Sequence, residues 1–161
     1  MNMSVTSCKV RKANLDDIRV MTSLLKELYG HDGENGFEDH RHRAGLRRLI
    51  AQKDAAVLVA EMEDLVVGMC TVQTVVATAE GTLAGLLEDM VVHDKFRGQG
   101  VGTALLGAAE RWAAEHKLGH LRIITGEENA EALVFYKARG WRMTHLAGLR
   151  RTIERRRGYD N

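Results

Sequence analysis

The sequence predicts an α/β protein of the α+β type, in which helices flank one mixed sheet. A length of 161 residues is typical of a single domain, so we expect one domain over residues 1–161. Helices alternate with strands only in the second half of the chain, which favours a mixed sheet over a fully parallel one. A glycine-rich turn at residues 97–102 joins a strand directly to a strong helix.

The composition excludes several classes of protein. The 23 basic and 22 acidic residues leave a net charge of +1, so no overall field favours nucleic acid or an anionic membrane as a partner. The longest apolar runs have the length of strands, far below the ~20 residues that span a bilayer, and residues 1–14 lack a signal-peptide core. Cys8 and Cys70 have no metal-binding spacing. We therefore expect a cytoplasmic protein with free thiols.

The N-terminal part begins with a short strand at residues 8–11, followed by a helix. Asn14 is a helix N-cap, and Asp17 stands three residues later, where the partner of a capping box stands. Apolar residues at helical spacing continue this helix to Tyr29, and Gly30 ends it.

The middle of the chain alternates less regularly. We expect a loop at 30–36, a helix at 37–53, and an antiparallel hairpin formed by strands at 55–61 and 65–78. Gly68 is a candidate β-bulge in the second of these strands. A further strand is expected at 83–92.

The C-terminal part contains two helices. The first is expected at 103–117 and ends at Gly119, with one apolar face made of Val101, Leu105, Ala108 and Trp112. A strand at 120–125 follows, and then a helix from the N-cap Asn129 to Gly140. Weaker strands are expected at 141–146 and 149–154.

The glycine-rich turn has the features of a phosphate site. Glycine lets backbone amide groups approach an anion, and the start of a helix presents unpaired N–H groups with a favourable dipole. A dinucleotide fingerprint would require a third glycine where Thr103 stands, and no Walker-type string is present, so NAD and ATP sites are disfavoured. A tight turn without a ligand is the alternative.

Two segments resemble the GCN5-related N-acetyltransferase (GNAT) superfamily. The run 87–92, followed by Arg97-Gly98-Gln99-Gly100-Val101-Gly102, resembles its motif A. Asn129, the run Phe135-Tyr136-Lys137 and Gly140-Trp141 resemble a second family segment, so the specific part spans residues 86–141. The resemblance implies a mostly antiparallel mixed sheet, splayed between its fourth and fifth strands and flanked by four helices, with acetyl-CoA as co-substrate.

The resemblance also implies residue roles. The amide groups of Met90, Val91 and Val92 would bind the pantetheine arm and the thioester carbonyl. Asn129, which is also a plain N-cap, would touch the pantetheine, and Tyr136 would lie near the sulfur unless it is only a core residue. The amides that would cradle the pyrophosphate belong to Arg97, Gly98, Gln99, Gly100, Val101, Gly102 and Thr103.

The chemistry requires a proton acceptor, because an ammonium group has no lone pair with which to attack. A carboxylate can serve, and the resemblance to family members with Glu-Asp at this position implies that Glu88 is the base. Strand alternation places Glu88 and Met90 on one face and Asp89 and Val91 on the other, so one acid faces the acceptor. Asp89 is the reserve, since a bulge would exchange the faces. Glu88 could instead pair with an arginine. Direct attack in a ternary complex is favoured, because the matched motifs contain no Cys or Ser.

The acceptor is expected beside the loop that follows the first helix. An acidic rim there would suit a cationic small-molecule amine, although a solvated loop explains the same residues: His31, Asp32, Glu34, Glu38 and Asp39. We expect no metal, because a His-x-His pair on a helix points two ways. The arginine-rich tail is expected to be a solvated end. Alternatives are a protein lysine or N-terminal amine as acceptor, or a non-catalytic acyl-CoA sensor; a homodimer is the family's habit.

Overall fold

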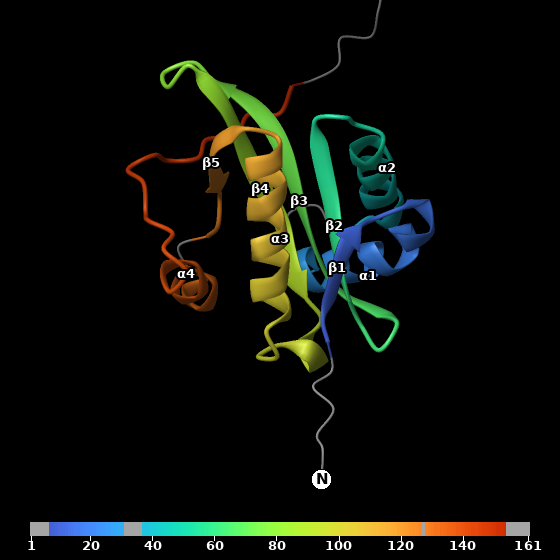
Figure 1. The fold of residues 1–161 in the computed structure, drawn as a ribbon. Helices are drawn as coiled ribbons and strands as arrows, with labels where there is room; N and C mark the ends of the chain where they lie inside the picture. Colours follow the sequence, from blue (N-terminus) through green and yellow to red (C-terminus); the bar gives the residue numbers. More distant parts are fainter. Residues whose placement is uncertain (1–6, 31–36, 127, 154–161) are drawn as a thin grey trace, which may run out of the picture. The chain divides into compact units, whose positions relative to one another are not determined.

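Five strands form one sheet in the order β1-β2-β3-β4-β5. All neighbours are antiparallel except β4 and β5, which are parallel (Figure 1). This confirms the predicted mixed and mostly antiparallel sheet. The strands are β1 (Lys9–Lys12), β2 (Ala55–Met62), β3 (Leu65–Ala77), β4 (Thr82–Val92) and β5 (Leu118–Ile123).

The computed structural model describes residues 7–30, 37–126 and 128–153. The chain divides into two compact units, residues 1–123 and residues 124–161. The first unit contains the whole sheet and three of the helices: α1 (Ile18–Tyr29), α2 (Asp39–Ile50) and α3 (Val101–Glu115). Two short 3-10 helices, η1 (Leu15–Asp17) and η2 (Asp94–Phe96), precede α1 and α3.

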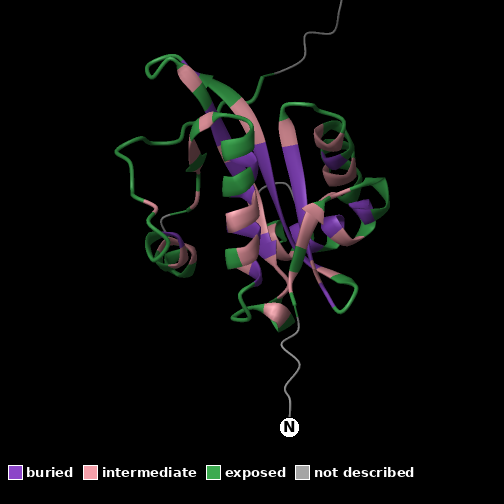
Figure 2. Cartoon of the chain, viewed as in Figure 1, coloured by how far each residue is buried: buried purple, intermediate pink, exposed green. Residues whose placement is uncertain are grey.

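The helices of the first unit cover both faces of the sheet (Figure 1). Helices α1 and α2 pack on one face, where Met21 and Leu24 join Val59, Met69 and other apolar residues in one core cluster. Helix α3 packs on the opposite face and buries Val101, Leu105, Ala109 and Trp112. Figure 2 shows that the central strands are the most buried part of the sheet.

Local sequence signals explain how these elements begin and end. Asn14 accepts a hydrogen bond from the Asp16 amide, and the Asn14 amide donates to Asp17, each at 2.8 Å, so the predicted capping box is confirmed. Glu63 and Asp64 have φ values of 50° and 62° and make the two-residue turn between β2 and β3.

Several predicted boundaries in this unit are displaced: the helix predicted at 37–53 is α2 at Asp39–Ile50, the helix predicted from 103 begins at Val101, and the strand predicted at 120–125 is β5 at Leu118–Ile123. The prediction for Gly119 is wrong. Gly119 does not end α3; the helix ends at Glu115, and Lys117, with φ of 59°, reverses the chain. Gly119 instead lies within β5, where an added Cβ would come within 2.9 Å of the Thr82 side chain. The glycine therefore permits close packing of β5 against the start of β4.

The second unit contains α4 (Ala130–Lys137). Asn129 caps it by accepting a hydrogen bond from the Ala132 amide at 3.1 Å, and Gly140 follows with φ of 84°. The strands predicted at 141–146 and 149–154 are absent from the described part of this unit, where residues 141–153 form no ladder. An apolar alternation forms a strand only when a neighbouring strand pairs with it.

Among the described residues, no helix is long and apolar enough to cross a membrane.

Candidate active site

The pairing between β4 and β5 stops before β4 ends. The last matched pair is Leu87 with Ile123, whereas β4 continues to Val92. This loss of pairing is where the sequence predicted the sheet to splay. Beyond this pair, Glu88, Val91 and Val92 have ladder partners only on the β3 side.

The backbone amide and carbonyl of Val92 face away from β3 at this edge. The His93 amide donates to the Val67 carbonyl at 2.8 Å. Because pairing groups alternate along an antiparallel strand, Val91 also points toward β3 and Val92 points to the side that β5 no longer occupies. The Arg97 side chain confirms this direction for the Val92 carbonyl, to which its Nε donates at 3.0 Å. Of the three predicted amide donors, Val92 is thus clearly directed to the open edge.

The glycine-rich turn connects this edge to α3. Gly98 and Gly100 have φ values of 72° and 84°, which favour glycine. An added Cβ at either position would meet no protein atom within 4 Å, so open space adjoins the turn. Gly100 is the N-cap of α3, and the amides of Val101 and Gly102 in the first helical turn have no intrahelical carbonyl partner. Such a helix start can bind a phosphate.

Strand β4 contains a bulge beside this edge. The register moves from Met69–Val91 to Thr71–Glu88, so β4 has one residue more than β3 in this interval. Asp89 lies in the interval and has φ of 53°, a left-handed conformation for a residue with a side chain. The predicted alternation is therefore wrong here.

The bulge places both acids on the α1 face of the sheet. Glu88 lies opposite Thr71 and accepts a hydrogen bond from Gln73 Nε2 at 3.2 Å. Asp89 accepts one from Thr71 Oγ1 at 3.1 Å and one from Tyr29 Oη at 2.7 Å. Because of the extra residue, the Asp89 side chain lies on the same face as Glu88, whereas regular alternation would place it on the opposite face.

The surroundings of Glu88 change its acidity. Partial burial raises the pKa of Glu88, the neighbouring charge of Asp89 raises it further, and the hydrogen bond from Gln73 opposes both effects. A carboxylate with a raised pKa is a better proton acceptor than an ordinary surface glutamate. The role of Glu88 as a general base stays a prediction, which its raised pKa supports.

Tyr29, Thr71 and Gln73 were not identified from the sequence. Thr71 and Gln73 are polar residues two apart in the same strand, and that spacing is a signal that they share a face. Tyr29 offers no such signal, because only tertiary packing brings the end of α1 to the bulge.

Two predicted site residues belong to the second unit. Tyr136 is 6% exposed and lies beside Phe135 and Trp141, with ring centroids 5.2 Å and 5.5 Å away. Asn129 caps α4. Their roles at the pantetheine and the sulfur stay predictions.

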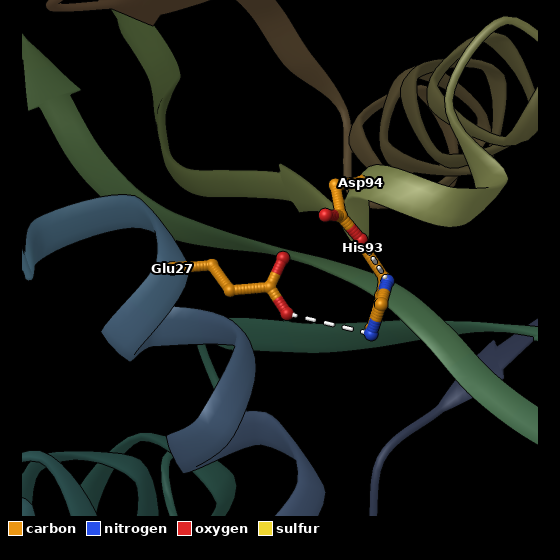
Figure 3. A group of neighbouring side chains, drawn as sticks. All are labelled: Glu27, His93 and Asp94. Carbon is orange, nitrogen blue, oxygen red and sulfur yellow. Dashed lines mark ion pairs between the residues drawn. The ribbon is translucent and has the colours of Figure 1, made fainter.

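His93, at the end of β4, lies between two carboxylates (Figure 3). Its Nδ1 is 2.8 Å from Asp94 Oδ1, and its Nε2 is 3.6 Å from Glu27 Oε1. Ligand atoms of the three residues lie within 4.8 Å of one another, the spacing of a possible metal site. Each ring nitrogen of His93 has its own carboxylate neighbour, so the group links α1 to the turn before α3. Asp94 is thereby turned toward His93.

The acidic rim predicted near the acceptor is only partly described. His31, Asp32 and Glu34 lie outside the described residues. Glu38 pairs with Arg41 at 3.0 Å, and Asp39 pairs with Arg43 at 3.5 Å. Each of these two acids therefore has a basic partner on helix α2.

Comparisons with known proteins agree with this geometry. The acetyltransferase (GNAT) domain family matches residues 53–143. An uncharacterised N-acetyltransferase of Archaeoglobus fulgidus is 24% identical over 147 residues, which cover 87% of this chain and 97% of that protein. The uncharacterised Bacillus subtilis protein YxbD is 40% identical over 58 residues, 36% of this chain and only 34% of YxbD.

The fold is also similar to a solved structure. An aminoglycoside N-acetyltransferase AAC(6')-Iy, determined in complex with CoA, has a TM-score of 0.78 and 20% sequence identity. The alignment covers 91% of this chain and 95% of that chain. At this identity, the likeness is one of fold.

Proposed function

Because this chain belongs to the acetyltransferase (GNAT) family, we propose that it transfers an acetyl group from acetyl-CoA to a primary amine, with Glu88 as the proton acceptor. The observation that carries the proposal is the position of Glu88. Its carboxylate, with a raised pKa, stands where β4 bulges and loses its β5 neighbour. This position supports the proposal, because the carboxylate lies beside a strand edge whose backbone groups can bind a ligand.

The residues of the edge and the turn fit the two polar parts of acetyl-CoA. Gly98 and Gly100 leave open space beside a helix start, which suits a pyrophosphate. The side chain of Arg97 already lies at the open edge and can add a positive charge. We assign the Val92 amide to the pantetheine or the thioester carbonyl, with Met90 and Val91 nearby. When bound, acetyl-CoA supplies an acetyl group activated as a thioester.

Side chains of the protein then accept and donate the protons of the reaction. An alkyl ammonium group has a pKa near ~10, so it must lose a proton to Glu88, directly or through water, before the nitrogen can attack. Direct attack in a ternary complex needs no nucleophilic side chain. We propose that Tyr136 donates a proton from its hydroxyl group to the departing sulfur.

The acceptor proposed here is a cationic small-molecule amine. Glu88 and Asp89 lie on one face of the sheet and offer two carboxylates to a positive group. An anionic site attracts a cationic substrate and raises its local concentration. The name of the structural neighbour, an aminoglycoside N-acetyltransferase, is consistent with such a class of acceptor.

The test is thiol release from acetyl-CoA with a panel of small amines and a lysine peptide. We expect turnover by the wild type and a loss of roughly 100-fold or more in Glu88→Gln, because general-base catalysis typically contributes that much. Tyr136→Phe should lower the rate as well. Glu110→Gln, at an exposed position on α3, is the matched control and should keep the wild-type rate.

Different results separate the alternatives. Unchanged rates in both Glu88→Gln and Tyr136→Phe would remove the catalytic assignment. Turnover with the lysine peptide alone would point to a protein acceptor. CoA binding in calorimetry without turnover on any amine would contradict an enzymatic role and favour an acyl-CoA sensor.

A further inference from the structure

The bulge in β4 has a conformation that needs support from its surroundings. Asp89 has φ of 53°, and a residue with a Cβ in this region is less stable than one in extended conformation. Aspartate tolerates the region better than most residues, but its side chain is then usually held by a hydrogen bond. The partners of Asp89 therefore decide how well the bulge is defined.

Two hydroxyl groups from two different elements hold the Asp89 carboxylate. Thr71 Oγ1 donates to one oxygen at 3.1 Å, and Tyr29 Oη donates to the other at 2.7 Å. Thr71 is fully buried on β3, so its hydroxyl is fixed by the sheet. Tyr29 is the last residue of α1 and is 37% exposed, so its hydroxyl depends on how the end of α1 is placed.

We propose that Tyr29 is a positioning residue for acetyl transfer: its hydroxyl holds Asp89 in the bulge and so keeps the charge of Asp89 beside Glu88. This inference rests on the proposed function, in which Glu88 is the base. Tyr29 itself is assigned no contact with the reacting atoms. Its effect passes from α1 to β4 through one short hydrogen bond.

The consequence for Glu88 follows from electrostatics. The charge of Asp89 is one of the two causes that raise the pKa of Glu88. If Tyr29 no longer holds Asp89, the carboxylate can turn away and the repulsion between the two acids becomes weaker. The pKa of Glu88 then falls toward its ordinary value, and the base becomes weaker.

Two other ionisable side chains, from β3 and α2, lie in the surroundings of Asp89 and Tyr29. Cys70 on β3 has a thiol pKa of about 12, raised by burial and also by the charge of Asp89. His42 on α2 lies beside Tyr29, with ring centroids 6.1 Å apart. Because the titration of Glu88 must be distinguished from the titration of these groups, the experiment measures the pKa of the Glu88 carboxyl group directly.

The experiment compares Tyr29→Phe, Asp89→Asn and the double variant. We expect Tyr29→Phe to lower kcat roughly tenfold, the scale of a hydrogen bond to a charged group. The acidic limb of its rate–pH profile should move to lower pH. Asp89→Asn should shift the limb in the same direction and by a larger amount. The double variant should be no slower than Asp89→Asn, because both changes interrupt the same interaction.

The control is Thr74→Val on β3. Thr74 alternates to the opposite face of the sheet from Thr71, so this variant should keep the wild-type rate and pH profile. A Tyr29 that only stabilised the fold would lower the melting temperature and leave the pH profile unchanged. That result, or effects of Tyr29→Phe and Asp89→Asn that multiply, would overturn the proposal.

A separate readout keeps the test independent of turnover. The pKa of Glu88 can be followed by NMR with a 13C label in the glutamate side-chain carboxyl group. We expect it to fall in Asp89→Asn and, to a smaller extent, in Tyr29→Phe. If the wild-type protein shows no turnover with any amine, the proposed function is refuted. If the Glu88 pKa is unchanged in Tyr29→Phe, the positioning role is refuted.

Discussion

Replacing Gly100 with alanine tests whether the turn before α3 binds a phosphate group. Gly100 has φ of 84°, and an added Cβ would meet no protein atom within 4 Å. The substitution therefore adds backbone strain but no steric clash within the protein. A bound pyrophosphate, by contrast, would lie in the space that the new methyl group occupies.

The expected magnitudes follow from these two facts. A left-handed φ costs a non-glycine residue about 1–2 kcal/mol. The lower entropy of the unfolded chain returns about 0.4–1 kcal/mol, which leaves a net loss of about 1 kcal/mol in the free energy of unfolding. The loss of one charge-assisted hydrogen bond from a backbone amide would cost about 1.5–3 kcal/mol of binding free energy, so the Kd for CoA should rise at least about tenfold.

Urea unfolding and calorimetric titration with CoA measure the two quantities. Gly81→Ala is the matched control, because Gly81 has φ of 63° and equally open surroundings but lies in the turn between β3 and β4. It should lose similar stability and bind CoA as the wild type does. A Gly100→Ala variant that loses stability but keeps the wild-type Kd would refute the phosphate-binding role of the turn.

Three further predictions concern titratable groups. Glu88 must be ionised to accept a proton and its pKa is raised, so the acidic limb of the rate–pH profile should lie above the ordinary glutamate pKa of ~4.3; a limb at or below that value would contradict the assignment. Asp17, whose side chain is 8% exposed, bonds to Arg11 at 2.7 and 2.9 Å. Its pKa is lowered in the folded protein, chiefly by this bond, so its stabilisation is present above the unfolded pKa of ~3.9 and is lost as pH falls through the folded value. Asp17→Asn should reduce the free energy of unfolding by about 2–3 kcal/mol at pH 7. This is below the roughly 3–5 kcal/mol of a fully buried pair, because Arg11 is part-exposed. At pH 2 the reduction should be much smaller, and an equal reduction at both pH values would contradict the reasoning. Cys70, buried and with a thiol pKa of about 12, should resist alkylation at pH 8 in native protein and react once urea unfolds it.

Local sequence patterns predicted much of the fold because their causes are local. The capping residues Asn14 and Asn129 hydrogen-bond to the next turn of their own helices. The glycine-rich turn was predicted directly before α3, and the left-handed φ values of Gly98 and Gly100 suit glycine. Such signals depend on residues within one turn, so no tertiary information is needed to interpret them.

Features that depend on a partner strand were predicted less well. The segments expected as strands at 141–146 and 149–154 have suitable residues but form no ladder in the described chain. Gly119 was interpreted as a helix end, although its role is close packing against Thr82 on β4. In both cases the deciding atoms lie far away in the sequence.

The sequence by itself determined the family motifs and the glycine turn before α3, because these are carried by residue types at short spacing. The choice of Glu88 as the base stays a prediction. Only the tertiary structure decided how the acids are arranged. The register between β3 and β4 creates the bulge at Asp89, and the packing of α1 brings the Tyr29 hydroxyl to it. A single extra residue in a ladder reverses which side chains share a face, and that residue can be located only when both strands are paired.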